Sequence, residues 1–468
     1  MPETAQMRPV SAGAARSGSE SHARVWTLVA TSLGFAVVQL DVSIVNVAIK
    51  SIGAGLGGGV SGLQWVVNAY TIAFAACILT AGSIADRIGA RRLFVGGFAL
   101  FMTASAVCGL APDLGVLIGA RAVQGLAAAL LVPSSLALLS HAYTDDRART
   151  HAIGIYLAGA STALSGGPLI GGALIAAIGW RAIFFINIPI ALCGVFLTLR
   201  FADETTRSAT RGVDVPGQIF AIATLVLLVG STIEGGQHGF GATGVLIGYA
   251  AGVACGCAFV AVEARGRSPM LPLSLFASRR FSVSSLAGLL INIAFYGLIF
   301  VISLFFQRVQ NLSPLTTGLA LAPTMIGITV SNIASGWLQH RFGAGRILAA
   351  GALVVAAACA GMLGVDASTA YTAMVVQLIA LGAGGGLVVP TVTSQVLSSV
   401  PRRRSGVAAG TLNTLRQTGS AIGVALFGSL LAGSDGFVPG VHASFAISIG
   451  LGLAVAALAP LLRLRAGR

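Results

Sequence analysis

The chain has 468 residues, of which 56% are hydrophobic and 9% charged, and its formal net charge is +14. Soluble domains carry about 25% charged residues, so this composition excludes a large soluble protein. Runs of roughly 20 apolar residues recur along the whole sequence, which is typical of a polytopic membrane protein.

Residues 1–25 are small and polar, and we expect them to form a disordered cytoplasmic tail. The apolar run that follows is too long for a signal peptide and lacks a good cleavage site. Because backbone groups in lipid must hydrogen-bond within their own segment, we predict that all apolar runs are helices. Fourteen spans are expected, at residues 26–48, 63–84, 93–111, 114–139, 150–178, 182–201, 215–234, 241–263, 282–305, 314–338, 347–365, 372–398, 405–432 and 441–463.

The basic residues predict the orientation of these spans. With the N-terminus in the cytoplasm, 23 of the 28 lysines and arginines fall in inner segments and 3 in outer ones, while Arg121 and Arg416 lie within spans. This asymmetry follows the positive-inside rule and predicts a multi-pass protein of the cytoplasmic membrane with both termini inside. Topology thus explains the positive charge, and we expect no nucleic-acid partner.

The sequence contains an internal repeat. The stretch GSIADRIGARR from Gly82 resembles GWLQHRFGAGR from Gly336, and GLAAALLVP ending at Pro133 resembles GAGGGLVVP ending at Pro390. Each pair is shifted by eight spans, which predicts two six-helix halves with two extra helices between them. The expected segments are the tail 1–25, a first bundle 26–201, a two-helix linker 202–281, a second bundle 282–463 and a tail 464–468.

Five stretches carry a resemblance to a known family: LDVSIVNVAI in the first span, GSIADRIGARR after the second, RAVQGLAAALLVPSS in the fourth, GASTALSGGPLIGG in the fifth and WRAIFFINIP entering the sixth. With these motifs in order, the sequence resembles the major facilitator superfamily, specifically its fourteen-helix drug:proton antiporters. The resemblance implies an all-α polytopic membrane protein with the major facilitator fold. It also implies proton-driven export of a small, lipophilic substrate. We expect no cofactor, with the proton gradient as energy source, and a monomer.

Asp41 puts a carboxylate inside the first apolar run, where an ionised group costs about 2.5–3.5 kcal/mol on insertion scales. Arg121 is its candidate partner, since both residues lie roughly 10–12 Å from the outer ends of their spans at 1.5 Å per residue. The family resemblance makes these two spans neighbours. Our hypothesis is that Asp41 carries the transported proton and binds Arg121 when ionised. A fixed structural ion pair is the alternative.

The resemblance assigns roles to two further motifs. The loop after the second span would lock the two halves on the cytoplasmic side, through Gly82, Asp86, Arg87, Gly89, Arg91 and Arg92. His340 replaces Asp86 in the second copy, which predicts a weaker lock there. The fifth-span motif is typical of exporters and predicts a bending seam, because proline interrupts the helix and glycines allow close packing. Its residues are Gly159, Gly167, Pro168, Gly171 and Gly172, and a plain packing face is the alternative.

Polar residues inside the spans are candidates for a substrate cavity. Arg416 lies deep in its span and needs an acceptor, which either substrate or backbone carbonyl groups would supply. Glu234 and Glu263 fall at span ends and are expected at the membrane interface. The six cysteines lie within apolar runs, and no metal site is predicted. The cavity candidates are Gln39, Tyr70, Gln124, Asn292, Tyr296, Asn413 and Arg416.

Two functions remain open from the sequence. The first is a proton-coupled antiporter that exports lipophilic drugs or antibiotics, and the second is the same chemistry devoted to a single metabolite, siderophore or self-made antibiotic. An enzyme or ATP-driven pump is disfavoured, because the phosphate-binding loop G-x-x-x-x-G-K-[ST] needs a lysine after glycine. The only lysine is Lys50, which follows Ile49 and, with the glycines after it, predicts a flexible outer loop.

Overall fold

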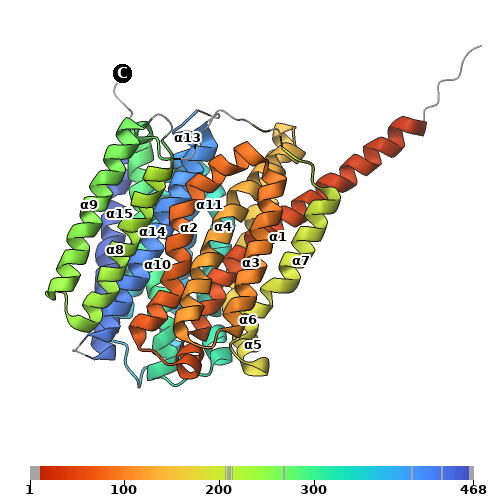
Figure 1. Cartoon of the computed structure of the whole chain (residues 1–468). Coiled ribbons are helices and arrows are strands. Elements are labelled where there is room, and N and C mark those ends of the chain that lie inside the picture. The colour runs from red at the N-terminus through yellow and green to blue at the C-terminus, as the bar shows by residue number, and fades with distance from the viewer. Residues whose placement is uncertain are drawn as a thin grey trace, which may run out of the picture.

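The computed structural model describes residues 11–205, 207, 212, 214–266, 269–401, 404–433 and 436–462, and every regular element in this part of the chain is a helix. Fourteen long helical rods result, and each coincides with a predicted span (Figure 1). Their bounds are α1 Ser11–Leu56, α2 Val60–Ile88, α3 Ala90–Leu110, α4 Leu114–Ala142, α5 Asp146–Ile178, α6 Ala182–Phe185 continued by α7 Asn187–Phe201, α8 Val215–His238, α9 Thr243–Arg265, α10 Arg279–Leu304, α11 Pro314–Phe342, α12 Ala344–Gly361, α13 Tyr371–Ser398, α14 Ser405–Ala432 and α15 Phe437–Leu458.

Thirteen of these rods are long and apolar enough to cross a membrane, within the described residues. The fourteenth, α14, is less apolar than the others because its middle carries Asn413, Arg416 and Gln417. It nevertheless runs beside α2, α8 and α10 inside the bundle, so its polar side chains face protein more than lipid. The predicted fold class, an all-α membrane protein of fourteen helices, is confirmed.

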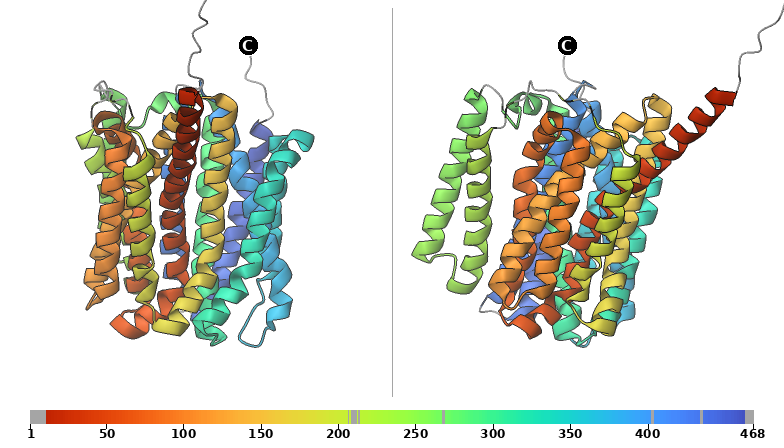
Figure 2. Two further views of the ribbon diagram at one scale, coloured as in Figure 1. Left: turned by 90° about the vertical axis from the view of Figure 1, so that its right-hand side faces the viewer. Right: turned by 45° about the vertical axis from the view of Figure 1, so that its right-hand side comes forward.

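The rods form two groups and a separate pair. Helices α1–α7 make the first group and α10–α15 the second, and these groups touch mainly where α5 meets α11 and where α2 meets α14. Helices α8 and α9 pack on each other at the edge of the bundle (Figure 2). The contact of α8 with the bundle includes a small apolar cluster, in which Val229 and Ile233 meet Ile72 of α2 and Ala421 of α14. Gln218 of α8 also donates to the backbone oxygen of Ala76 at 3.0 Å.

The N-terminal segment differs from its prediction. Instead of a disordered tail over residues 1–25, the structure continues α1 from Ser11, and this part projects away from the bundle (Figure 1). The physical reason is that extending an existing helix avoids the cost of nucleation, and the alanines of SAGAARSGSESHA favour helix. Residues 1–10 and 463–468 lie outside the described part.

Candidate functional site

A buried ion pair joins α1 to α4. The guanidinium Nη1 of Arg121 donates to Oδ2 of Asp41, and both side chains are at most 1% exposed. Asp41 and Arg121 are thus paired in the structure, as their similar depth in the two spans predicted. Breaking a buried pair by removing one partner costs about 3–5 kcal/mol, because the remaining charge stays buried without compensation.

Amide side chains complete the network around the carboxylate. Oδ1 of Asp41 accepts hydrogen bonds from Asn187 Nδ2 at 3.0 Å and from Gln124 Nε2 at 3.2 Å. Ser105 accepts from both amides, at 2.7 Å from Gln124 and 3.4 Å from Asn187. Four helices, α1, α3, α4 and α7, thus contribute to one polar cluster in the first group, and every contact to Asp41 comes from a donor.

The guanidinium of Arg121 is held on its other sides as well. Its Nε donates to the backbone oxygen of Val66 at 3.1 Å, and Nη1 also donates to Oε1 of Gln124 at 2.8 Å. The Tyr70 ring lies against it, with the guanidinium carbon 4.4 Å from the ring centroid, which adds a cation–π contact. Arg121 would therefore keep several partners if Asp41 lost its charge.

The arrangement gives protonation a defined consequence. A protonated Asp41 has an O–H that must donate, yet the groups that contact it now are all donors. Oδ1 of Asn187 is buried without a hydrogen-bond partner, so rotation of that amide would supply the missing acceptor. With Asn187 turned in this way, a neutral carboxyl at this position would not be left unsatisfied.

The turn between α2 and α3 is built around a carboxylate from a distant loop. Gly89 has φ +99°, a conformation that favours glycine, and Arg91 N donates to Oε1 of Glu204 at 2.9 Å. Ala90 N donates to Thr205 Oγ1 at 2.9 Å. Glu204 thus caps the N-terminus of α3, where the helix dipole favours an anion. We call the end of the bundle that carries this turn the turn end, and the opposite one the far end.

The remaining residues of the predicted lock lie around this turn. Arg91 donates to the backbone oxygens of Thr198 and Leu199, which ties α3 to α7 within the first group. Arg92 Nε is 3.9 Å from Glu204 Oε2. Asp86 and Arg87 are exposed in the last turn of α2, one turn beyond Gly82.

The glycines and proline of α5 lie at its contacts with both groups of helices, inside one continuous helix. Gly167 and Gly171 lie against Ser43 and Ile44 of α1, so closely that a Cβ on either glycine would collide with them. One residue further on, Gly172 packs on the backbone of α11, at Pro314 and Leu315, and Pro168 packs on Gly318. One helix therefore touches both groups. Gly159 makes only an ordinary contact with Ser32.

The two groups are joined by hydrogen bonds at the far end. Lys50 of α1 donates to the backbone oxygen of Gln307, and Ser303 Oγ donates to the backbone oxygen of Asn46 at 2.7 Å. Gln64 of α2 donates to Val424 and Ala425 of α14 at 3.1 and 2.7 Å, respectively. Lys50 is thus part of a helix and a bridge between the groups, which corrects the prediction of a flexible loop from this residue.

A sequence model of the Major Facilitator Superfamily matches residues 31–424. The chain belongs to this superfamily. It is 36% identical over 424 residues to the methylenomycin A resistance protein of Streptomyces coelicolor (91% of this chain, 89% of that one) and 34% identical over 462 residues to the cephamycin export protein CmcT of Amycolatopsis lactamdurans (96% and 95%). It is also 35% identical over 412 residues to the multidrug resistance protein Stp of Mycobacterium tuberculosis (87% and 75%).

A solved structure shares the fold. The human organic anion transporter MFSD10 superposes with a TM-score of 0.66 at 17% identity, covering 94% of this chain and 99% of that one. The three relatives named above are called resistance or export proteins, and this chain shares their superfamily. It is a transporter and not an enzyme.

The predicted cavity residues of this superfamily member fall into three sets. Tyr70 and Gln124 belong to the Asp41 network, and Tyr70 also donates to Val38 O at 3.4 Å. Asn292 donates to Gly288 of its own helix at 2.7 Å, which indicates a packing role. The others are partly exposed in mid-helix; they are Gln39, Tyr296, Asn413 and Arg416.

Arg416 stands out among the partly exposed residues. Its Nε is buried without a hydrogen-bond partner, and no acid in the described residues forms an ion pair with it. No backbone carbonyl group therefore accepts from this Nε. Of the two predicted interfacial acids, Glu234 is exposed beside His238, whereas Glu263 is buried and accepts from Leu271 N at 3.0 Å. Folding of the α9–α10 loop over Glu263 explains that difference.

Sequence reasoning missed three functional side chains. Asn187 and Ser105 sit in apolar spans that contain other polar residues, so nothing in their immediate surroundings singles them out. Glu204 follows another acid, Asp203, in the ADETTR loop, and the local sequence does not distinguish the two. Its position soon after the sixth span was the one available signal, because loops at this end are otherwise rich in arginine.

Proposed function

We propose that this protein is a proton-coupled antiporter that exports lipophilic drugs or antibiotics across the cytoplasmic membrane by alternating access. The observation that carries the proposal is the buried Asp41–Arg121 pair with the unpartnered Asn187 oxygen beside it. An ionisable residue inside a membrane helix costs free energy to insert, and such residues commonly mark functional sites, among them the proton relays of transporters. Both termini are cytoplasmic in this scheme, no cofactor is needed, and the protein acts as a monomer.

The packing supports a route from protonation to movement of the two groups. Asp41 is followed in α1 by Ser43 and Ile44, the residues on which Gly167 and Gly171 of α5 rest. The next glycine of α5, Gly172, rests on α11 of the second group. When Asp41 is neutral and Arg121 is released, a shift of α1 is passed to α5 and from there to the contact between the groups.

The breadth of the substrate range distinguishes the first function from its alternative, a dedicated exporter of one metabolite, siderophore or self-made antibiotic. The relative named for multidrug resistance favours a broad range. The relatives named for methylenomycin A and cephamycin favour a single compound. A resistance screen over chemically diverse antibiotics in a host that lacks its own pumps separates these two functions, since a broad exporter protects against many classes.

The proton-coupling role is tested by Asp41→Asn in the same host and in proteoliposomes. The amide cannot take up a transported proton, so we expect drug efflux driven by a pH gradient to disappear while the protein still reaches the membrane. Asp113→Asn, which alters a helix cap outside the network, is the matched control and should retain efflux. Gradient-driven efflux by the Asp41→Asn protein at the wild-type rate would show that Asp41 is only a structural partner of Arg121.

A further inference from the structure

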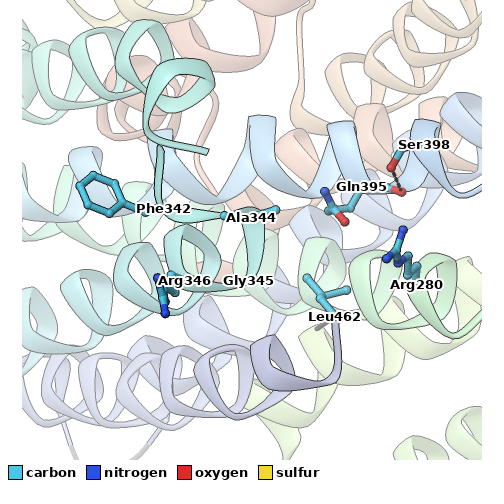
Figure 3. Close-up of a pocket in the computed structure, with 9 residues that line it drawn as sticks. Arg280, Phe342, Ala344, Gly345, Arg346, Gln395, Ser398 and Leu462 are labelled. Carbon is cyan, nitrogen blue, oxygen red and sulfur yellow. Dashed lines mark hydrogen bonds between the residues drawn. The ribbon is translucent and has the colours of Figure 1, made fainter. Parts of the chain in front are cut away.

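A pocket of about 440 Å³ opens at the turn end of the second group (Figure 3). It is formed where α12 begins, with the ends of α11 and α13 and the start of α10 around it. Arg346 and Arg280 come from different helices, and Gln395 and Ser398 of α13 add polar groups between them (Figure 3). Phe342 and Leu462 supply apolar walls.

The pocket carries positive charge that the described part of the chain leaves uncompensated. The side chains of Arg280 and Arg346 are both exposed, and neither guanidinium forms an ion pair or hydrogen bond within the described residues. The N-terminus of α12 has no side-chain cap, so its backbone N–H groups and the positive end of the helix dipole add to the field. An anion is the chemistry that fits.

The internal repeat shows what an occupied site of this type looks like. Gly343, at the start of α12, has φ +85° and ψ 144°, close to the 99° and 137° of Gly89 at the start of α3. Beside Gly89 the space is filled by the carboxylate of Glu204, which accepts from Arg91 N. Beside Gly343 a Cβ would meet nothing within 4 Å. The same backbone thus binds an anionic group in one copy and is open in the other.

The surroundings of the pocket indicate where the anion comes from. Exposed apolar residues follow one face of α11 toward Phe342, at spacings of four, three and four residues: Ile326, Val330, Ile333 and Trp337, each at least 60% exposed. Such a stripe on a membrane helix faces acyl chains, and Trp337 near its end is a typical interfacial residue. A headgroup in the pocket would have its acyl chains along this stripe.

We propose that this pocket binds the headgroup of an anionic phospholipid. The lipid phosphate accepts from the α12 N-terminus and Arg346, Arg280 binds headgroup oxygens, and the acyl chains lie on α11. Basic pockets between membrane helices are suited to anionic headgroups. The lipid does in the second group what Glu204 does in the first, namely to neutralise the start of a helix. This inference does not depend on proton coupling.

The test is native mass spectrometry of the purified full-length protein in neutral detergent, titrated with phosphatidylglycerol or with phosphatidylcholine of the same acyl chains. We expect wild type to retain phosphatidylglycerol preferentially and Arg280→Gln/Arg346→Gln to lose that preference on the order of tenfold, from two basic residues. Arg147→Gln/Arg200→Gln removes the same two charges from exposed positions at the turn end of the first group and should behave like wild type. Equal loss in Arg147→Gln/Arg200→Gln, or no loss in Arg280→Gln/Arg346→Gln, would overturn the proposal.

Two further arms identify the source of the anion and guard against misfolding. Gln395→Glu keeps both arginines but puts a carboxylate into the pocket on a partly exposed side chain of nearly the same shape, as Glu204 does in the first copy, and should abolish lipid retention without lowering the melting temperature. Unchanged retention in this variant contradicts the assignment. Inorganic phosphate alone is the second probe: if it displaces phosphatidylglycerol at millimolar concentrations, the site serves a free anion and the lipid assignment is wrong.

Discussion

The turns that open α3 and α12 start from nearly the same backbone but end with different electrostatics. At α3, Glu204 caps the helix and lies near Arg92, whereas at α12 the equivalent Arg346 borders an open pocket. A second repeat position differs in the same way. Arg121 in α4 corresponds to Leu378 in α13, and both are fully buried. The first group thus satisfies its charges internally, while the second is apolar at one such position and open to a ligand at the other.

The two copies share their helix packing but differ at the charged positions. Glycines that let helices touch are found in both groups, such as Gly125 against Tyr70 and Gly382 against Thr324, where a side chain would overlap the neighbouring backbone. These two positions are offset by the repeat distance. Packing constrains both copies because a collision destabilises either one, whereas a buried ion pair is needed only where it is used.

The largest effect is expected from giving the first group the residue of the second, in Arg121→Leu. Asp41 would remain buried without its cation, which costs about 3–5 kcal/mol. We expect a lowered melting temperature in detergent and no gradient-driven efflux. The double variant Asp41→Asn/Arg121→Leu removes both charges, so stability should return while efflux stays absent. A single variant as stable as wild type would mean that the pair does not need to be charged.

Much of this architecture was predictable, since lipid leaves the backbone few alternatives and hydropathy alone delimits the spans. The partner of Asp41 could be found from depth, because membrane helices have nearly fixed lengths and directions. Asn187 could not, since its role depends on how α7 is rotated relative to α1. Glu204 caps a helix that starts over a hundred residues earlier in the chain, and the Arg346 pocket looks in sequence like any basic inner loop. Contacts of this kind follow from tertiary packing, which local patterns do not encode.

The second largest effect is expected at the contact between the groups, in Gly318→Ala. The added methyl group would overlap the backbone oxygen of Pro168 on α5, and overpacking of this kind costs about 1–3 kcal/mol. Because the contact joins α5 to α11, slower transport should accompany the lowered melting temperature. Gly336→Ala on the same helix meets nothing within 4 Å and is the matched control. If both variants transport at the wild-type rate, α5 and α11 do not move against each other during the cycle.

The smallest effect is expected for the difference in stability between Gly89→Ala and Gly343→Ala, which change only the two turns. Both alanines must adopt positive φ, so both variants carry a similar backbone strain of about 1–3 kcal/mol. Only at Gly89 does the new methyl group also displace Glu204 from the start of α3, and loss of a helix cap costs about 1 kcal/mol more. Thermal unfolding of the two variants in the same detergent measures this difference. Adding Glu204→Gln to each variant should lower the melting temperature further in Gly343→Ala, where the cap is intact, and hardly at all in Gly89→Ala. Equal losses in both backgrounds would mean that Glu204 does not stabilise α3 through this cap, and the contrast between the two turns would have no energetic basis.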